Sequence, residues 1–204
     1  MKIGIYHMIM ALTLAVLFAS CATSPPRQFP IRYYKENEAT ILQIEKQYNK
    51  LFRNKPIAAE FSDNDFKYIT IEMKTDSLRY IYEFNLTEKR LGDTLHKYGY
   101  DTMAVLKLIR DMQAIKCTWI NSMDYYLDDG KQSLTFMSIR PKQLDLPFAE
   151  KRYYILTFYK QPQYYDAEGR LLDKRNRRRL RKVNNEVFWR INDRVCYTLS
   201  DKFR

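Results

Sequence analysis

Apolar residues in this chain recur at two different spacings, and the order of these spacings limits the folds open to it. Between residues 37 and 56 they fall three or four positions apart, which is the spacing of one helix face. These residues are Ile41, Ile44, Tyr48, Leu51 and Phe52. Several later segments alternate apolar and polar residues, as strands with one buried face do. The chain is therefore expected to begin with a helix at Asn37 and to continue largely as strands.

Three pairs of alternating segments are joined by short polar connections, which predicts three β-hairpins. The pairs are residues 66–74 with 78–84, 115–127 with 131–140, and 187–191 with 195–199. Asp129-Gly130 in the second connection is a strong hairpin signal, and Asn192-Asp193 is expected to form a two-residue turn in the third. Residues 153–159 predict one further strand.

A pair of helices is predicted in the middle of the chain. Thr87 is a candidate N-cap for a helix that ends before Gly99, and Asp101 is a candidate N-cap for the next. Strands and helices do not alternate regularly, and no Gly-rich turn leads from a strand into a helix. The expected fold class is therefore α+β, an antiparallel sheet of about six to seven strands with the N-terminal helix and the central helix pair on one face.

The first residues have the layout of a secretory signal. Residues 3–19 contain no Asp, Glu, Lys or Arg, and Lys2 supplies a positive charge before them. A run of this length is at the short end of the ~17 to 25 residues that a spanning helix needs, so a cleaved signal is favoured over a permanent anchor.

The end of this segment resembles the lipobox of bacterial lipoproteins. The matching residues are Leu17-Phe18-Ala19-Ser20-Cys21, and Phe18 departs from the pattern because an aliphatic residue, usually Leu, is expected there. The resemblance implies cleavage before Cys21 and attachment of acyl chains such as palmitate at that cysteine. It covers residues 1–21 only, and no family is recognised for the rest of the chain. An ordinary signal peptide or an uncleaved helix with a chance cysteine is the alternative.

The resemblance also implies a location. Ala22-Thr23-Ser24-Pro25-Pro26 follow the cysteine, without the Asp that marks retention in the inner membrane of enteric-type bacteria and without an acidic cluster. The expectation is a lipid anchor in the outer membrane, facing the periplasm. The expected organisation is a signal peptide at 1–20, a lipidated tether at 21–36 and a single domain at 37–204, which is long enough for one core.

The charge of the chain favours anionic partners. The formal net charge is +11, and loss of Lys2 with the signal leaves +10. Residues 170–182 contain eight Lys or Arg, and the candidate anion-binding residues are Arg175, Arg177, Arg178, Arg179, Arg181 and Lys182. Expected partners are anionic lipid, a glycan polymer or an envelope protein, while export argues against nucleic acid. The alternative is that the segment is only a solvated loop.

Other candidate sites are weaker. Cys117 and Cys196 could pair in an exported protein or be buried free thiols. Four Tyr-Tyr pairs (Tyr33-Tyr34, Tyr125-Tyr126, Tyr153-Tyr154 and Tyr164-Tyr165) could form an aromatic platform, but adjacent strand residues point to opposite faces, which favours one ring of each pair in the core.

Catalysis finds little support in the sequence. His96 is the single histidine after the signal, on a polar stretch of a predicted helix, and Asp63-Asn64-Asp65 lacks the Gly and closing Glu of a calcium loop. No catalytic residue, metal site or cofactor is therefore predicted. The function expected is a non-catalytic envelope interaction module with a basic, Tyr-rich surface. The alternative is an envelope glycan or peptide hydrolase that uses carboxylates such as Asp124 with Asp128 or Asp129.

Overall fold

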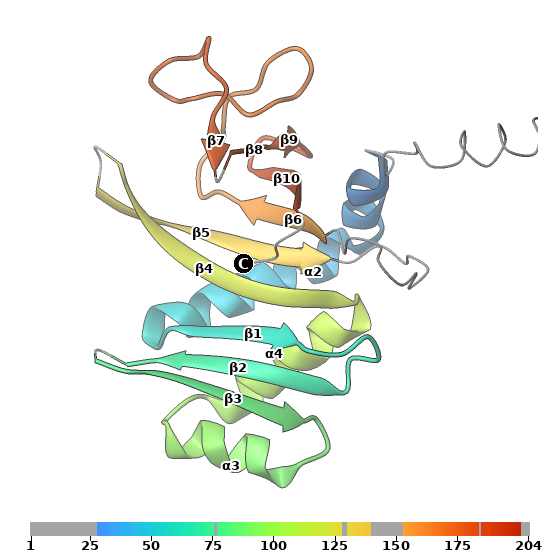
Figure 1. Cartoon of the computed structure of the whole chain (residues 1–204), viewed down its shortest axis with the longest axis vertical. Coiled ribbons are helices and arrows are strands. Elements are labelled where there is room, and N and C mark those ends of the chain that lie inside the picture. The colour runs from blue at the N-terminus through green and yellow to red at the C-terminus, as the bar shows by residue number, and fades with distance from the viewer. Residues whose placement is uncertain (1–27, 76, 128–129, 140–152, 184, 201–204) are drawn as a thin grey trace, which may run out of the picture.

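The structure is a computed structural model that describes residues 28–75, 77–127, 130–139, 153–183 and 185–200 (Figure 1). Its helices are α2 (Gln28–Asn54), α3 (Lys89–Lys97) and α4 (Thr102–Ala114). Its strands are β1 (Ile57–Phe61), β2 (Tyr68–Lys74), β3 (Arg79–Asn85), β4 (Cys117–Leu127), β5 (Gly130–Ile139), β6 (Tyr153–Phe158), β7 (Lys182–Val183), β8 (Glu186–Val187), β9 (Trp189–Arg190) and β10 (Val195–Ser200). None of the helices in these ranges is long and apolar enough to cross a membrane.

Eight of the strands form one sheet, in the order β3-β2-β1-β4-β5-β6-β10-β9, while β7 and β8 pair separately. Every neighbouring pair is antiparallel. The α+β class and the antiparallel sheet are therefore confirmed, but the sheet has more strands than the six to seven predicted. The missed central strand is β1, whose Ala58 and Ala59 give no strong strand signal because alanine is not enriched in strands.

The first helix begins at Gln28 and not at the predicted Asn37. Pro30 lies in its first turn, where the missing backbone N–H has no helical partner to lose, so a proline is tolerated there. Tyr34 from this early part is buried. Residues 28–36 are therefore helical, and the prediction that they form an irregular tether is wrong.

The main core lies between α2, α4 and one face of the sheet (Figure 1). Ile41, Ile44 and Tyr48 of α2 are fully buried in it, as the helical spacing predicted. The hydroxyl of Tyr48 donates a hydrogen bond of 2.5 Å to the carbonyl oxygen of Ile57, which ties α2 to β1. We call the sheet surface that faces these helices the helix face, and the opposite surface the open face.

The predicted helix ends are mostly confirmed. Gly99 follows α3 with a φ of +68°, the left-handed conformation that glycine adopts readily, and the Asp101 side chain caps α4 by accepting from the backbone N–H of Ala104 at 3.0 Å. The predicted cap of α3 at Thr87 is wrong, because Glu88 holds the N-cap position and the Thr87 hydroxyl donates to Asn85.

The C-terminal hairpin forms with a longer turn than predicted. Cys196 pairs with Arg190, and the backbone N–H groups of Ile191 and Asn192 both donate to the carbonyl of Val195. The Asn192 side chain accepts from the N–H groups of Arg194 and Val195, and it thereby shapes the wider turn. The two-residue turn at Asn192-Asp193 is therefore not present.

The chain between β6 and β9 crosses to the open face and covers part of it. We call residues 160–188 the arm. Leu171 and Phe188 of the arm are buried against Leu134, Tyr159 and Cys196 of the main sheet and its margin. Among the described residues, the helices and strands of the arm do not extend over the β1–β4 side of the open face (Figure 1).

Candidate functional sites

The open face holds a groove between the uncovered strands and the arm. Strand alternation directs Ile57, Ala59 and Phe61 of β1 into the helix-face core and leaves Ala58 and Glu60 on the open face. The groove has a cavity volume of about 540 Å³, which is within the ~300 to 1,000 Å³ range of small-molecule sites.

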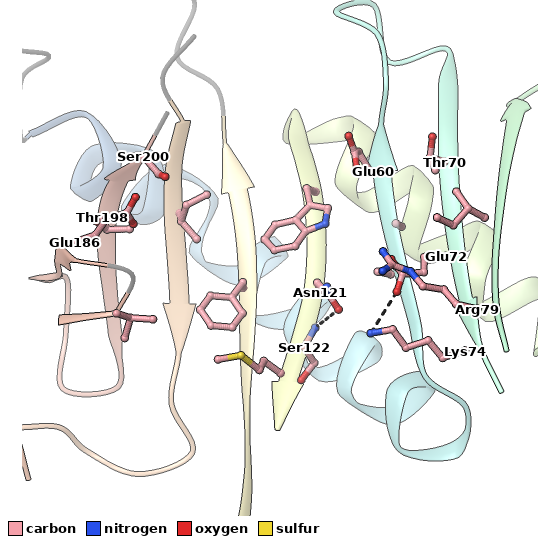
Figure 2. Close-up of a pocket in the computed structure, with 18 of the residues that line it drawn as sticks. Glu60, Thr70, Glu72, Lys74, Arg79, Asn121, Ser122, Glu186, Thr198 and Ser200 are labelled. Atoms are coloured by element: carbon pink, nitrogen blue, oxygen red, sulfur yellow. Dashed lines mark hydrogen bonds and ion pairs between the residues drawn. The ribbon is translucent and has the colours of Figure 1, made fainter. Parts of the chain in front are cut away.

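The groove has an apolar floor and polar margins. The floor is formed by Trp119, Met123, Phe136 and Ile155 of the sheet, with Val183 and Phe188 of the arm beside them. Figure 2 shows Glu60, Thr70, Glu72, Lys74 and Arg79 on one side and Glu186, Thr198 and Ser200 on the other. Ile81 and Met123, which line the groove, are 57% and 46% exposed, so apolar surface is available to a ligand.

The carboxylate of Glu72, in the groove, forms ion pairs with two basic side chains. One carboxylate oxygen lies 3.2 Å from Lys74 Nζ, and the other is paired with the Arg79 guanidinium on the neighbouring strand. Lys74 and Arg79 are directly opposite each other in the β2–β3 register. A carboxylate held in this way stabilises the strand pair and is poorly placed to exchange protons with a substrate.

Glu60 lies beside an aromatic ring. It is directly opposite Trp119 in the β1–β4 register, and both residues line the groove. Trp119 is in turn opposite Ser138, a small buried residue on β5. Residues 60 and 119 are distant in the sequence, so this carboxylate–indole pair could not be predicted from local patterns.

The basic segment forms a folded loop at the tip of the arm. We call residues 173–179 the basic loop. It is closed by the bridge between Leu172 and Leu180 and by a 2.8 Å hydrogen bond from the Asp173 N–H to the Arg179 carbonyl. The Asp173 carboxylate accepts from the N–H groups of Arg175 and Asn176, which lowers the pKa of that carboxyl.

The predicted anion-binding residues divide into two groups. Arg175, Arg177, Arg178 and Arg179 are exposed on the basic loop, and the Arg177 guanidinium lies 3.9 Å from the ring centroid of Tyr164. Arg181 is half-buried, with its guanidinium 5.5 Å from the ring centroid of Tyr159. Lys182 is exposed at the start of β7. The structure therefore places four of the six on the exposed basic loop and Arg181 against Tyr159 at the margin of the sheet.

The arm and the start of α2 are at the same end of the molecule (Figure 1). A hydrogen bond of 3.3 Å from Asn192 Nδ2 to the Tyr34 hydroxyl joins the first turns of α2 to the turn before β10. The residue at which the N-terminal segment enters the fold is therefore on the side of the molecule from which the basic loop projects, and α3 is at the far end.

The two cysteines are buried free thiols on opposite faces of the sheet. Cys117 belongs to the helix-face core and Cys196 to the cluster under the arm, so the disulfide considered from the sequence is not present. Burial raises the pKa of the Cys117 thiol to about 12 and also raises the pKa of Cys196. Thiols with such pKa values are largely protonated near neutral pH and react weakly.

The tyrosine pairs do not gather on one surface in the part of the chain described. Tyr34, Tyr153 and Tyr154 are buried, whereas Tyr164 is exposed on the arm. The side chains of Tyr125 and Tyr126 lie outside the described residues. The described rings thus serve mainly the core.

The residues considered for catalysis or metal binding are not brought together. His96 is exposed on α3, and Asp124 is exposed on β4, while Asp128 and Asp129 lie outside the described residues. The Asp63 carboxylate accepts from the N–H groups of Lys67 and Tyr68, so this segment is a turn that leads into β2. Among the described residues, no group of three or more His, Cys, Asp or Glu side chains could hold a metal ion.

Comparison of the chain with protein-family models, with curated proteins and with solved structures finds no match.

Proposed function

We propose that this chain is a lipid-anchored, non-catalytic interaction module of the bacterial envelope that rests on an anionic surface through its basic loop. The observation that carries the proposal is the placement of the basic loop and the start of α2 at the same end of the molecule. A lipid on Cys21 and the loop's guanidinium groups would then act on the same leaflet.

The distance from Cys21 to Gln28 supports this arrangement. Seven residue steps span at most about 25 Å even when fully extended, at ~3.3 to 3.6 Å per residue. A domain held this closely stays near the lipid head groups, where each basic residue contributes about 1 kcal/mol of attraction to an anionic leaflet. The proposed location is the outer membrane, on the periplasmic side.

The folded form of the basic loop also favours binding. Backbone hydrogen bonds to Asp173 and Asn176 order the loop before any ligand arrives, so less conformational entropy is lost on contact. Arginine suits phosphate groups because its planar guanidinium donates two parallel hydrogen bonds. The shared chemistry is a phosphate-bearing anion, and anionic lipid head groups are the source that this geometry favours.

The groove offers limited support for the alternative of a carboxylate hydrolase. Glu60 and Glu72 are on the same face of adjacent strands, but Glu72 is paired with Lys74 and Arg79. The pair that the sequence suggested, Asp124 with Asp128 or Asp129, has its first member exposed on β4 and outside the groove lining. Binding is therefore the function proposed.

Vesicle binding tests the proposal. The chain from Ala22 onward, with its fold checked by circular dichroism, is mixed with vesicles of phosphatidylglycerol or of uncharged phosphatidylcholine and sedimented. We expect it to bind the anionic vesicles and to be released by added salt, because exposed charges are screened beyond ~8 Å at physiological ionic strength. Replacing Arg175, Arg177, Arg178 and Arg179 with Gln should remove most of the binding.

A matched variant separates the loop from net charge. Replacing Lys89, Arg90, Lys97 and Arg110 with Gln removes the same charge from exposed positions on α3, at the other end of the molecule, and on α4. Exposed substitutions of this kind usually change stability by within ~0.5 kcal/mol each. If both variants lose binding equally, the attraction comes from overall charge and the proposal for the basic loop is wrong.

A further inference from the structure

One arginine of the basic loop is held against an aromatic ring of the arm. The Arg177 guanidinium carbon lies 3.9 Å from the ring centroid of Tyr164, which is 39% exposed. A planar guanidinium at this distance rests on the face of the ring, where stacking and cation–π attraction both act on it. Among the described residues, the neighbouring Arg178 and Arg179 have no such ring contact. Arg177 is therefore the more ordered side chain of the three.

The backbone around Tyr164 fixes the position of its ring. The Tyr164 carbonyl accepts from the N–H of Leu172 at 2.9 Å, and Leu172 also bridges to Leu180 at the base of the basic loop. On the other side, the N–H of Gln163 donates to the Asp193 carbonyl at 2.8 Å. The ring is thus carried by a segment tied both to the base of the basic loop and to the turn before β10.

The stacked guanidinium keeps its hydrogen-bond donors available. Stacking uses the flat face of the group, whereas its N–H donors lie in the plane and point outwards from its edge. Within the part of the chain that the structure describes, no carboxylate or carbonyl oxygen bonds to the Arg177 side chain. Arg170 of the arm is by contrast paired with Asp166 and Glu168. Arg177 combines an ordered position with donors that can bind a ligand.

A guanidinium held in this way suits a phosphate group. Two of its in-plane N–H donors match two phosphate oxygens, and charge-assisted bonds of this kind are about twice as strong as neutral ones. Because the side chain is already ordered, it loses less rotamer entropy on binding than the exposed Arg178 and Arg179 would. Of these three arginines, Arg177 is the best suited to a direct bond.

We propose that Arg177, held by Tyr164, bonds directly to the phosphate group of an anionic lipid, while Arg178 and Arg179 contribute long-range attraction only. This inference rests on the proposed contact of the basic loop with a membrane and assigns the residue that recognises phosphate within it. Arg177 makes the contact depend on the shape of the anion as well as on its charge.

Charge-preserving variants test the role of Arg177. The full chain, purified in dodecyl maltoside, is titrated by calorimetry with short-chain phosphatidylglycerol, and the same titration into empty micelles is subtracted. Arg177→Lys keeps the positive charge but removes the planar donor fork, so it should weaken binding about threefold to tenfold. Arg178→Lys is the matched control and should bind as the wild type does, because long-range attraction depends on charge alone.

Variants of Tyr164 test the role of the ring. Tyr164→Leu removes the stacking surface and should weaken binding about threefold, whereas Tyr164→Phe keeps the ring and should bind as the wild type does. The double variant of Tyr164→Leu with Arg177→Lys should bind no more weakly than Arg177→Lys alone, since both changes remove the same interaction. Circular dichroism checks that each variant is folded.

Two further probes identify the source of the phosphate group. Inorganic phosphate offers the oxygens without a lipid, and short-chain phosphatidylcholine offers a phosphate whose charge is balanced by choline. We expect phosphatidylglycerol to bind more tightly than either, because it carries a net negative charge and the micelle concentrates it beside the protein. Equally tight binding of inorganic phosphate would assign Arg177 to a free phosphate ligand and overturn the lipid assignment.

Other outcomes would overturn the role of Arg177 itself. Equal binding by the wild type and Arg177→Lys would show that no planar fork is used. Equal weakening by Tyr164→Phe and Tyr164→Leu would show that the ring does not hold the arginine in place. Either result can occur while the wild type still binds anionic vesicles, so it would overturn this inference and leave the proposed function standing. A wild type that binds neither vesicles nor phosphatidylglycerol would overturn both.

Discussion

At the residue scale, buried and half-buried tyrosines connect the helices and the central loops to the sheet. The Tyr48 hydroxyl donates to Ile57, and the Tyr100 hydroxyl donates to the Pro56 carbonyl at 2.9 Å. The Tyr33 hydroxyl donates to the Ile115 carbonyl at 2.5 Å, just before β4. Each bond satisfies a backbone acceptor at the end of an element, where the regular ladders leave carbonyl groups without partners. Much of the tyrosine content is thus explained by the core.

These tyrosines predict sensitivity to alkaline pH. Desolvation raises the pKa of Tyr100 to about 12, whereas an unfolded tyrosine has a pKa of about 10. Between these values the folded state binds the proton more tightly than the unfolded state does. The free energy of unfolding should therefore be unaffected below pH ~10 and fall as pH rises towards ~12. Urea unfolding at a series of pH values measures this free energy of unfolding.

The matched variants are Tyr100→Phe and Tyr68→Phe. Tyr100→Phe cannot ionise and should flatten part of the pH dependence, at a cost of about 1 kcal/mol at neutral pH from the lost hydrogen bond. Tyr68 is 44% exposed on β2, so its removal should leave the pH dependence as it was. An identical slope in wild type and Tyr100→Phe would show that this residue does not carry the effect.

At the element scale, the arm is held to the sheet by few side chains. Leu171 of the arm is fully buried against the sheet, and its N–H donates to the Phe188 carbonyl at 2.9 Å. Cys196 lies under the arm as a buried thiol that fills space. Because this cluster is on the opposite face from the main core, we expect the arm to open locally while the helices stay packed.

Leu171→Ala should therefore loosen the arm selectively. Truncating a fully buried leucine costs roughly 2 to 5 kcal/mol, depending on how far the site collapses. We expect faster amide hydrogen exchange at Leu171 and Leu172, whose N–H groups bond within the arm, and unchanged protection in β1 and β2. Leu78→Ala removes a 56% exposed leucine and serves as the control. Equally faster exchange in β1 would indicate that the arm and the core unfold as one unit.

At the scale of the whole molecule, the basic loop and the groove lie on different surfaces. The basic loop is at the end where α2 begins, and the groove lies on the open face beside the arm (Figures 1 and 2). The proposed lipid anchor on Cys21 would hold the chain with the basic loop towards the membrane.

The anchor itself has a direct test. A Cys21→Ser variant of the full chain should fail to incorporate labelled palmitate and should no longer fractionate with membranes, because the acyl chains provide ~0.8 kcal/mol per buried CH₂. Cys117→Ala is the matched control: it removes a cysteine from the fold and should be labelled normally. Unchanged labelling of Cys21→Ser would refute the lipoprotein proposal.

The sequence by itself determined the features that depend on near neighbours. Helical spacing located the buried face of α2, Gly99 and Asp101 marked two helix ends, and alternation with polar connections identified the hairpins. The density of Lys and Arg likewise identified the basic loop. Each of these follows from spacing within a few residues, which backbone geometry fixes locally.

Only the tertiary structure decided the rest. Strand β1 is short and contains two alanines, and it becomes a central strand because β2 and β4 pair with its two edges. That pairing places Glu60 opposite Trp119, and the fold of the C-terminal hairpin brings the turn at Asn192 against Tyr34 in the first turns of α2. Register between strands that are distant in sequence is set by burial of whole faces, and no local pattern encodes it.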